Sequence, residues 1–189
     1  MIDFSARLVG VAAKHKTIMS QITLQKLLPS HAAELFILID HNSEYLKQWL
    51  GWVDKVREVQ DSSNFIKQVN DQIEQNKSLT FGIFFTNKLV GVIGFNKIDW
   101  QNKQANIGYW LAANYQGRGI ITMACQTLLD IGFAELNLTS ININCAIGNL
   151  KSQAIPIRLG FTKKELLKDH ELLNGRRVDH IIYSKQQNC

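Results

Sequence analysis

Residues 107–125 read IGYWLAANYQGRGIITMAC, and this stretch decides the fold that we predict for the chain. It begins with strand-forming residues, bends at two closely spaced glycines, and continues as an amphipathic segment. In that segment Ile121, Ala124, Cys125 and Leu128 fall on one helical face. We therefore expect a strand, a tight turn and a helix in immediate succession.

The turn at Gly117 and Gly119 is a candidate phosphate site. Glycine lets the backbone bend sharply and keeps side chains away from the amides. The amides of the helix's first turn lack partners within the helix and lie at the positive end of its dipole. Arg118 adds a charge-assisted donor beside them. A pyrophosphate-bearing cofactor is the first hypothesis, although Gly-x-Gly also occurs as plain punctuation between strand and helix.

The usual nucleotide-binding loops are absent. The sequence contains neither the mononucleotide pattern Gly-x-x-x-x-Gly-Lys-Ser/Thr nor the dinucleotide pattern Gly-x-Gly-x-x-Gly. If the turn binds a phosphate, it is therefore neither of these two loops.

Strand and helix patterns surround this stretch. Before it we expect a strand at 20–27, helices beginning at Ser30, near 43–50 and at 61–77, and a three-stranded meander at 79–85, 89–100 and 105–111. After it we expect a helix to about 135, a strand at 140–146 parallel to the central strand, a helix at 149–160, and a hairpin at 163–167 and 178–183 around Asn174-Gly175. This order predicts an α/β fold, one domain with a mixed, mostly antiparallel central sheet flanked by helices.

The composition is that of one soluble domain. The chain has 189 residues, 46% of them hydrophobic and 20% charged, and a domain of this length buries roughly 70% of its unfolded surface. The net charge of +5 suits an anionic cofactor or an acidic partner, although a solvated surface is the commoner reason for such a charge. The basic residues are scattered, so we expect no nucleic-acid partner.

The cysteines indicate a reducing compartment. Cys125, Cys145 and Cys189 are odd in number and widely spaced, which is typical of neither a disulfide framework nor a zinc site. We expect a cytoplasmic protein without a bound metal.

The N-terminal segment differs from the rest of the chain. No apolar run approaches the ~20 residues of a membrane span, so we expect no membrane partner. The short apolar run Leu8 to Ala13 is followed at once by Lys14, His15 and Lys16, which is not typical of a signal peptide. We expect residues 1–18 to form a poorly structured extension and residues 19–187 to form the domain.

Gln116 and Gly119 match the acyl-CoA signature Gln/Arg-x-x-Gly-x-Gly/Ala of the GNAT acetyltransferases, and Ile121 departs from its last position. The order of elements is also similar to the GNAT fold, from about residue 20 to 186. The segments 35–42, 49–54, 107–111 and 148–152 resemble the RimL-like group, the ribosomal-protein-serine acetyltransferases. Many members of that group have proline between the two tryptophans, where this chain has Gly51.

The resemblance implies an enzyme that transfers the acetyl group of acetyl-CoA to the N-terminal α-amine of a protein, by direct attack in a ternary complex. An α-amine has a pKa near ~7.7 to 8.0 against ~10.4 for lysine, so a weak base suffices. If the central strand splays from its parallel neighbour, the amides near Trp110 and Leu111 are free for the oxyanion. The implied co-substrate site comprises Trp110, Leu111, Gln116, Gly117, Arg118, Gly119, Ile120, Ile121, Thr122, Asn149 and Ser152.

Glu171 is the candidate general base, because the resembling group has a glutamate before the last hairpin; a solvent-facing glutamate is the alternative. Many GNAT enzymes place a tyrosine seven residues after the asparagine of the fifth-strand helix. Here that position is Pro156, which should kink the helix or delay its start. We expect Ser152 to replace the tyrosine as proton donor and Asn149 to contact the pantetheine arm. Helix capping is the other role for Asn149 and Ser152, and the two roles are compatible.

The sequence says less about the acceptor site than about the co-substrate site. Trp49 and Trp52 are either core filler or the walls of an acceptor pocket. His31, His41, His170 and His180 show no metal spacing, and His170 is a candidate to tune Glu171. Cys125 and Cys145 fit small buried residues better than nucleophiles.

Two other functions stay open. One is acetylation of a small amine such as a polyamine or an aminoglycoside, which a pocket with several carboxylates would favour. The other is a catalytically silent acyl-CoA-binding module. The sequence does not fix the oligomeric state, and a homodimer is among the options.

Overall fold

The computed structural model describes residues 11, 16–19 and 21–187. Its strands are β1 (Lys16–Met19), β2 (Ile22–Gln25), β3 (Leu79–Phe85), β4 (Lys88–Asp99), β5 (Gln104–Leu111), β6 (Ser140–Ala146), β7 (Thr162–Leu173) and β8 (Arg176–Gln186). Its α-helices are α2 (Ala32–His41), α3 (Ser43–Leu46), α4 (Val59–Glu74), α5 (Ile120–Asp130) and α6 (Leu150–Arg158). Short 3-10 turns lie at Pro29–His31, Val53–Lys55 and Ala113–Tyr115, and a π-helical turn lies at Ile131–Glu135.

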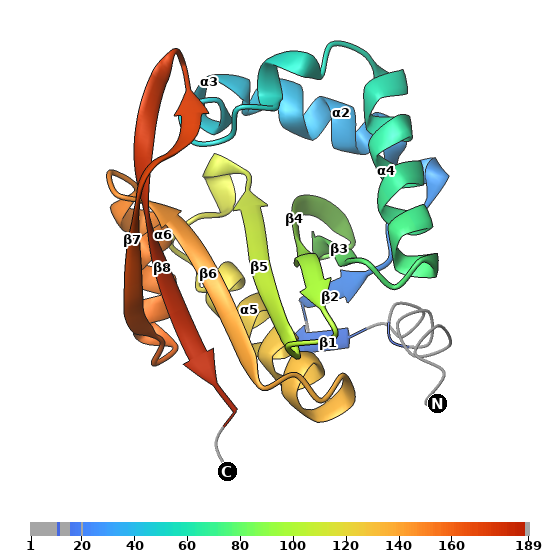
Figure 1. The fold of residues 1–189 in the computed structure, drawn as a ribbon. Coiled ribbons are helices and arrows are strands. Elements are labelled where there is room, and N and C mark those ends of the chain that lie inside the picture. Colours follow the sequence, from blue (N-terminus) through green and yellow to red (C-terminus); the bar gives the residue numbers. More distant parts are fainter. Residues whose placement is uncertain (1–10, 12–15, 20, 188–189) are drawn as a thin grey trace.

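The strands of the described residues form one sheet in the order β1-β2-β3-β4-β5-β6-β8-β7 (Figure 1). Every neighbouring pair is antiparallel except β5 and β6, which are parallel. This confirms the predicted mixed, mostly antiparallel α/β sheet. In the described part of the chain, no helix combines the length and the apolar character that a membrane crossing requires.

Two hydrophobic clusters place the helices on the sheet. One face of the sheet packs against three helices, through Leu35 of α2, Leu46 of α3 and Ile66 of α4. On the opposite face, Ala124 and Leu128 of α5 belong to the main core. The helix α6 lies on that second face as well, because the buried Gln153 accepts a hydrogen bond from Tyr183 of β8 at 3.0 Å. The sheet is thus the middle layer of three.

The predicted domain start needs a correction. Residues 16–19 form β1, which pairs with β2 in antiparallel register, Lys16 opposite Leu24. Val11 is 4% exposed and belongs to the main core. The sheet and the core therefore include residues that we expected in a poorly structured extension, because an edge strand finds its partners by pairing and not by local pattern. Residues 1–10 and 12–15 lie outside the described residues.

Helix starts differ from the prediction by a few residues. Ser30 lies in the 3-10 turn, so α2 begins at Ala32. The helix α4 begins at Val59 because Asp61 Oδ2 accepts hydrogen bonds from the amides of Arg57 at 2.8 Å and Glu58 at 3.1 Å. Asp61 thus caps the helix from within its first turn. The predicted start of this helix, Asp61, is therefore two residues too late.

The strands β5 and β6 open toward one end. They form the predicted parallel pair, but their pairing runs only from Gln104 opposite Ser140 to Ile107 opposite Ile143. Beyond these residues the two strands no longer pair with each other, and Figure 1 shows them diverging. The splay that the sequence left open is therefore present, and it positions the site.

Candidate active site

The turn before α5 has the backbone that its glycines predicted. Gly117 and Gly119 both have a φ of +74°, a left-handed conformation that glycine adopts readily. A β carbon at Gly117 would meet no atom within 4 Å. The first amide of α5 with a backbone partner is that of Met123, bonded to Gly119 O at 3.0 Å. Within the described chain the amides of 117–122 thus remain available, and they fit a diphosphate.

Two cations that the sequence analysis missed lie beside this turn. Lys151 Nζ donates to Gln116 Oε1 at 3.1 Å, and Arg158 Nη1 donates to Thr122 Oγ1 at 2.9 Å. Both residues come from α6 and line the cavity described below. Only the packing of α6 against α5 brings them here, so no local motif reveals them.

Arg118 points elsewhere. Its guanidinium lies 5.8 Å from the ring centroid of Phe85 and 5.4 Å from that of Tyr115, and it donates to Asn114 O at 3.1 Å. Unlike Gly117 and Gly119, it does not line the cavity. In this conformation the Arg118 guanidinium therefore lies against two aromatic rings, which attract the cation, and away from the cavity.

A cavity of ≈ 1250 Å³ extends from the turn through the opening between β5 and β6. On the α5 and α6 face it is lined by Tyr109, Cys145, Ser152 and Ile155, and on the other face by Trp49, Asn96, Asn106, Trp110 and Asn144. Successive strand residues point to opposite faces of a sheet, so the cavity reaches both. Its volume exceeds the ~300 to 1,000 Å³ of an ordinary ligand pocket. It has room for two substrates that meet in the plane of the sheet.

The amides that face this opening follow from the pairing of β4 and β5. The Ala112 amide donates to Val90 O at 2.9 Å, and donors alternate sides along a strand. The amide of Trp110 therefore also faces β4, whereas those of Tyr109 and Leu111 face the opening. Of the two expected donors, Trp110 and Leu111, only Leu111 therefore has an amide that faces the opening.

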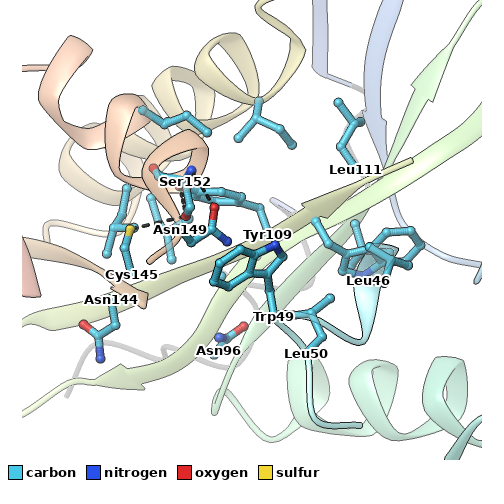
Figure 2. A pocket seen from close by; sticks show the side chains of 18 of the residues that line it. Leu46, Trp49, Leu50, Asn96, Tyr109, Leu111, Asn144, Cys145, Asn149 and Ser152 are labelled. Atoms are coloured by element: carbon cyan, nitrogen blue, oxygen red, sulfur yellow. Dashed lines mark hydrogen bonds between the residues drawn. The ribbon is translucent and has the colours of Figure 1, made fainter. Parts of the chain in front are cut away.

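Ser152 lies on the α6 side of the opening with a tyrosine hydroxyl beside it. Tyr109 Oη is 3.1 Å from both the carbonyl oxygen and Oγ of Ser152 (Figure 2). Pro156 has no amide hydrogen, so it leaves the Ser152 carbonyl without its helical partner. The Tyr109 hydroxyl donates to that carbonyl, so in its 3.1 Å contact with Ser152 Oγ it is the acceptor and Ser152 is the donor.

Pro156 lies inside α6 and neither breaks it nor delays its start. The predicted late start of this helix was therefore wrong. The Tyr109 hydroxyl satisfies the carbonyl that proline leaves unpaired, and the nine-residue helix continues.

Cys145 completes this group of polar atoms. Its Sγ lies 3.3 Å from Ser152 Oγ. Burial raises the pKa of the Cys145 thiol and raises that of Tyr109 well above its ordinary value of 10.0. Both groups are therefore protonated at neutral pH, which agrees with the expectation that Cys145 is not a nucleophile.

Asn149 caps α6. Its Oδ1 accepts a hydrogen bond from the Ser152 amide at 3.0 Å. The asparagine also lines the cavity, so its side-chain amide hydrogens face the space next to Ser152. Capping and ligand contact are compatible at this position, as the sequence analysis expected.

Glu171 lines the other end of the cavity. Its side chain is 40% exposed, and Oε2 lies 3.2 Å from Nε2 of His180, whose side chain is 10% exposed. The ring of His170 packs at 4.9 Å from that of His180. His180, and not the adjacent His170, is thus the direct neighbour of Glu171, because cross-strand pairing brings β8 beside β7.

The tryptophan segment covers the acceptor end. A β carbon at Gly148 would lie 3.6 Å from Trp49 Cη2, so Trp49 reaches across to the loop before α6. Trp52 is 37% exposed and packs against Trp110 at 6.2 Å between ring centroids. Both line the cavity. Nearby, Asn174 of the last hairpin donates to Lys47 O at 3.1 Å, which joins the hairpin to the end of α3.

Among the described residues, no group of three or more His, Cys, Asp or Glu side chains is arranged so that it could hold a metal ion. The arrangement instead offers main-chain amides and two cations for a diphosphate, a hydroxyl at the opening of the sheet, and a carboxylate beyond it.

Comparison with known proteins identifies the family of this chain. The family described as Acetyltransferase (GNAT) domain matches residues 21–162. The ribosomal-protein-serine acetyltransferase of Escherichia coli (strain K12) is 34% identical over 165 residues, which are 87% of this chain and 92% of that protein.

Two solved structures are similar over nearly the whole chain. RimL, a ribosomal L7/L12 alpha-N-protein acetyltransferase in complex with coenzyme A, has a TM-score of 0.89 at 28% identity and covers 92% of this chain and 98% of its own. The Microcin C7 self immunity acetyltransferase MccE, in complex with acetyl-CoA and AMP, has a TM-score of 0.88 at 36% identity, with 94% and 99% covered. The chain belongs to the GNAT acetyltransferase family, within its RimL-like group of N-acetyltransferases.

Proposed function

We propose that this enzyme transfers the acetyl group of acetyl-CoA to the N-terminal α-amine of a protein, with a ribosomal protein as the acceptor class. One observation carries the proposal: the cavity crosses the sheet, with Ser152 on one side and Glu171 on the other. The names of the E. coli relative and of RimL support the acceptor class.

The α5 side would hold the co-substrate. The free amides of 117–122 and the cations Lys151 and Arg158 fit its diphosphate and phosphate groups. The backbone edge of β5 at 109–111 is open toward β6, so it can pair with the amide groups of the pantetheine arm. The Leu111 and Tyr109 amides are the donors for the developing oxyanion.

Ser152 would donate the proton that the leaving thiolate needs. Its hydroxyl lies at the opening, and the Tyr109 hydroxyl is committed to the Ser152 carbonyl. The Ser152 proton is therefore directed to neighbouring acceptors and, during the reaction, to the departing sulfur.

Glu171 would take the proton from the acceptor amine, directly or through a water. An α-amine is partly deprotonated near neutral pH, so a carboxylate of ordinary basicity is sufficient. The position of Glu171 on the cavity wall also argues against a silent acyl-CoA-binding module, which has no use for a base there.

The acceptor end favours a chain terminus over a polycation. Among the described residues that line the cavity, Glu171 is the only carboxylate, whereas polyamines need several negative charges. Trp49 and the last hairpin lie at this end and would partly enclose an entering chain terminus.

Thiol release from acetyl-CoA tests the proposal. The panel comprises N-terminal peptides with serine, alanine or glycine first, spermidine, an aminoglycoside and, because MccE was solved with AMP, an amine-bearing adenosine nucleotide. We expect release with the peptides and no more than background with spermidine. Release with a small amine alone would replace the proposed acceptor, and release with none would favour the acyl-CoA-binding module.

We also propose that the enzyme works in the cytoplasm, since the buried Cys125 and Cys145 are free thiols. A homodimer stays a prediction, as does the lack of a nucleic-acid or membrane partner. Light scattering on the purified chain measures the oligomeric state directly.

A further inference from the structure

A β-bulge interrupts the pairing of β4 with β5 at Asn96. Phe95 of β4 lies opposite Ile107 of β5. The next pair along the strands is Lys97 opposite Asn106, so β4 advances two residues where β5 advances one. Asn96 is therefore the extra residue of the bulge. A bulge bends its strand and re-aims a side chain, and bulges are over-represented next to active sites.

A glycine on the neighbouring strand makes room for the side chain of Asn96. A β carbon at Gly108 of β5 would lie 2.3 Å from Nδ2, 2.7 Å from Oδ1 and 2.8 Å from Cγ of Asn96. The carboxamide of Asn96 therefore occupies the space that a side chain at position 108 would fill. The bulge and the glycine together direct this carboxamide across β5.

The carboxamide of Asn96 lies next to the opening between β5 and β6. Gly108 directly follows Ile107, the last residue of β5 that pairs with β6, and it precedes Tyr109, whose amide faces the opening. Asn96 and Gly108 both line the cavity. In Figure 2 Asn96 and Ser152 lie on opposite sides of the strands. Because the co-substrate would lie on the Ser152 side, Asn96 lies on the side where the acceptor would enter.

This carboxamide can be reached by a ligand and is not occupied by the protein. Asn96 is exposed, and its carboxamide makes no hydrogen bond to another described residue. A carboxamide carries donor hydrogens and an acceptor oxygen without a net charge. An extended peptide residue offers the complement, because its N–H and C=O point to the same side of the chain. An amine without a peptide group offers no such pair.

The spacing along β5 shows which part of an acceptor Asn96 can reach. The amides of Tyr109 and Leu111, which would hold the oxyanion, fix the position of the acetyl group and of the attacking amine. Gly108, over which the carboxamide lies, is one residue from Tyr109, or about 3.3 Å along the strand. In an extended acceptor the second residue lies at most about 3.6 Å from the first. An amine at the opening therefore brings the second residue within reach of Asn96.

We infer that Asn96 binds the backbone of the acceptor's second residue, with Oδ1 accepting a hydrogen bond from its N–H and Nδ2 donating one to its C=O. The inference rests on the proposed function, and it narrows the acceptor to a chain end with an extended peptide backbone. Asn96 is thus a specificity-determining residue, which favours a peptide over an amine that lacks a peptide group.

The test pairs an enzyme variant with a substrate variant. Two peptides of one sequence are compared, one with an ordinary bond and one with an N-methylated bond before the second residue. We expect the native enzyme to favour the ordinary peptide by about 5- to 10-fold in kcat/KM, as for the loss of one neutral hydrogen bond. Asn96→Leu keeps the size of the side chain but cannot form either hydrogen bond. It should lower kcat/KM for the ordinary peptide by at least the same factor and remove the discrimination.

Gly108→Ala is a second variant, which leaves Asn96 in place. The new β carbon would displace the carboxamide at the end of the Asn96 side chain, so the discrimination should weaken here too. Lys97→Leu is the matched control, because Lys97 is the exposed neighbour of Asn96 in the bulge and does not line the cavity. This control should keep the native rate and discrimination. Acetyl-CoA affinity, measured by calorimetry, should be unchanged in Asn96→Leu and Lys97→Leu.

Undiminished discrimination in Asn96→Leu would show that the methyl group acts through its bulk, and it would overturn the inference. Equal use of both peptides by the native enzyme would overturn it as well. Absence of thiol release from every N-terminal peptide with the native enzyme would instead refute the proposed function. The two failures are distinguishable, because the first leaves the acetylation of ordinary peptides intact.

Discussion

Glu171 and His180 lie on neighbouring strands, with Glu171 Oε2 and His180 Nε2 3.2 Å apart. Neither ring nitrogen of His180 has a well-aligned hydrogen bond among the described residues, so this is a close approach of the two side chains and not an aligned hydrogen bond. The carboxylate keeps 40% of its side-chain surface exposed to the cavity, and this exposure lets it meet an incoming amine.

Replacement of Glu171 by glutamine removes the proposed base and keeps the shape of the side chain. We expect kcat to fall by about 100-fold or more, as for loss of general-base catalysis, with the acetyl-CoA dissociation constant nearly unchanged. Glu165→Gln, an exposed glutamate on the same strand, is the control and should keep native turnover. An unaltered turnover and pH profile in Glu171→Gln would remove Glu171 from the mechanism.

Replacement of Ser152 by alanine removes the proposed acid. We expect kcat to fall about tenfold. This is less than the ~100-fold loss expected for an irreplaceable proton donor, because a water molecule can enter beside the alanine and donate the proton instead. Stopped-flow thiol release and calorimetry separate turnover from acetyl-CoA binding. Equal losses of both would make Ser152 a binding residue instead.

The histidine next to the base should make stability pH-dependent. Burial chiefly lowers the pKa of His180 from its ordinary value of 6.5; Glu171 opposes this shift and His170 adds to it. Above pH 6.5 both folded and unfolded chains hold it neutral. As pH falls below 6.5 the unfolded chain takes up the proton first, so folding loses stability.

His180→Gln cannot bind that proton. Between pH 7.5 and pH 5.0 we therefore expect the Tm of this variant to fall by less than the Tm of the native protein. His41 is exposed, so His41→Gln is the control and should behave like the native protein. Thermal unfolding followed by circular dichroism gives the three values. Parallel pH dependence in all three proteins would contradict the assignment.

At the scale of elements, α6 contains a proline that costs helix stability but orders the candidate site. Pro156 removes one helical hydrogen bond and leaves the Ser152 carbonyl to Tyr109, across 43 residues of sequence. The same helix brings Lys151 and Arg158 to the phosphate turn. One short helix thus contributes to both ends of the co-substrate site.

Pro156→Ala restores a backbone amide at position 156, which would compete with the Tyr109 hydroxyl for the Ser152 carbonyl. We expect the free energy of unfolding to rise by about 1 kcal/mol and Tm to rise by about 2 to 4 °C. The gain is smaller than the ~3 kcal/mol that a proline costs inside a helix, because the substitution also removes the buried contacts of the proline ring. We expect kcat to fall severalfold, since the Tyr109 hydroxyl then shares the Ser152 side chain. Higher Tm with undiminished kcat would show that the carbonyl contact has no role in turnover.

The elements themselves could largely be read from the sequence. The glycine turn at 117–119, the parallel strand at 140–146 and the hairpin at Asn174-Gly175 each have a local cause. The contacts between elements could not. The contact of Tyr109 with Ser152, the approach of His180 to Glu171 and the stacking of Arg118 on Phe85 depend on register and packing, which no local pattern specifies.

At the scale of the whole molecule, the central claim is that the opening between β5 and β6 joins two half-sites. The helices α5 and α6 cover the face where the co-substrate would bind, and α2, α3 and α4 cover the face where the acceptor would bind. The last hairpin crosses from one side to the other and brings Glu171 to the acceptor half. Neither half-site alone has both the proposed acid, Ser152, and the proposed base, Glu171.

A crystal structure with coenzyme A and a bound N-terminal peptide tests this claim most directly. The account predicts the diphosphate on the amides of 117–122, the sulfur at the opening next to Ser152, and the peptide amine on the opposite face near Glu171. A diphosphate bound elsewhere, or a peptide amine on the same face as the pantetheine arm, would contradict it.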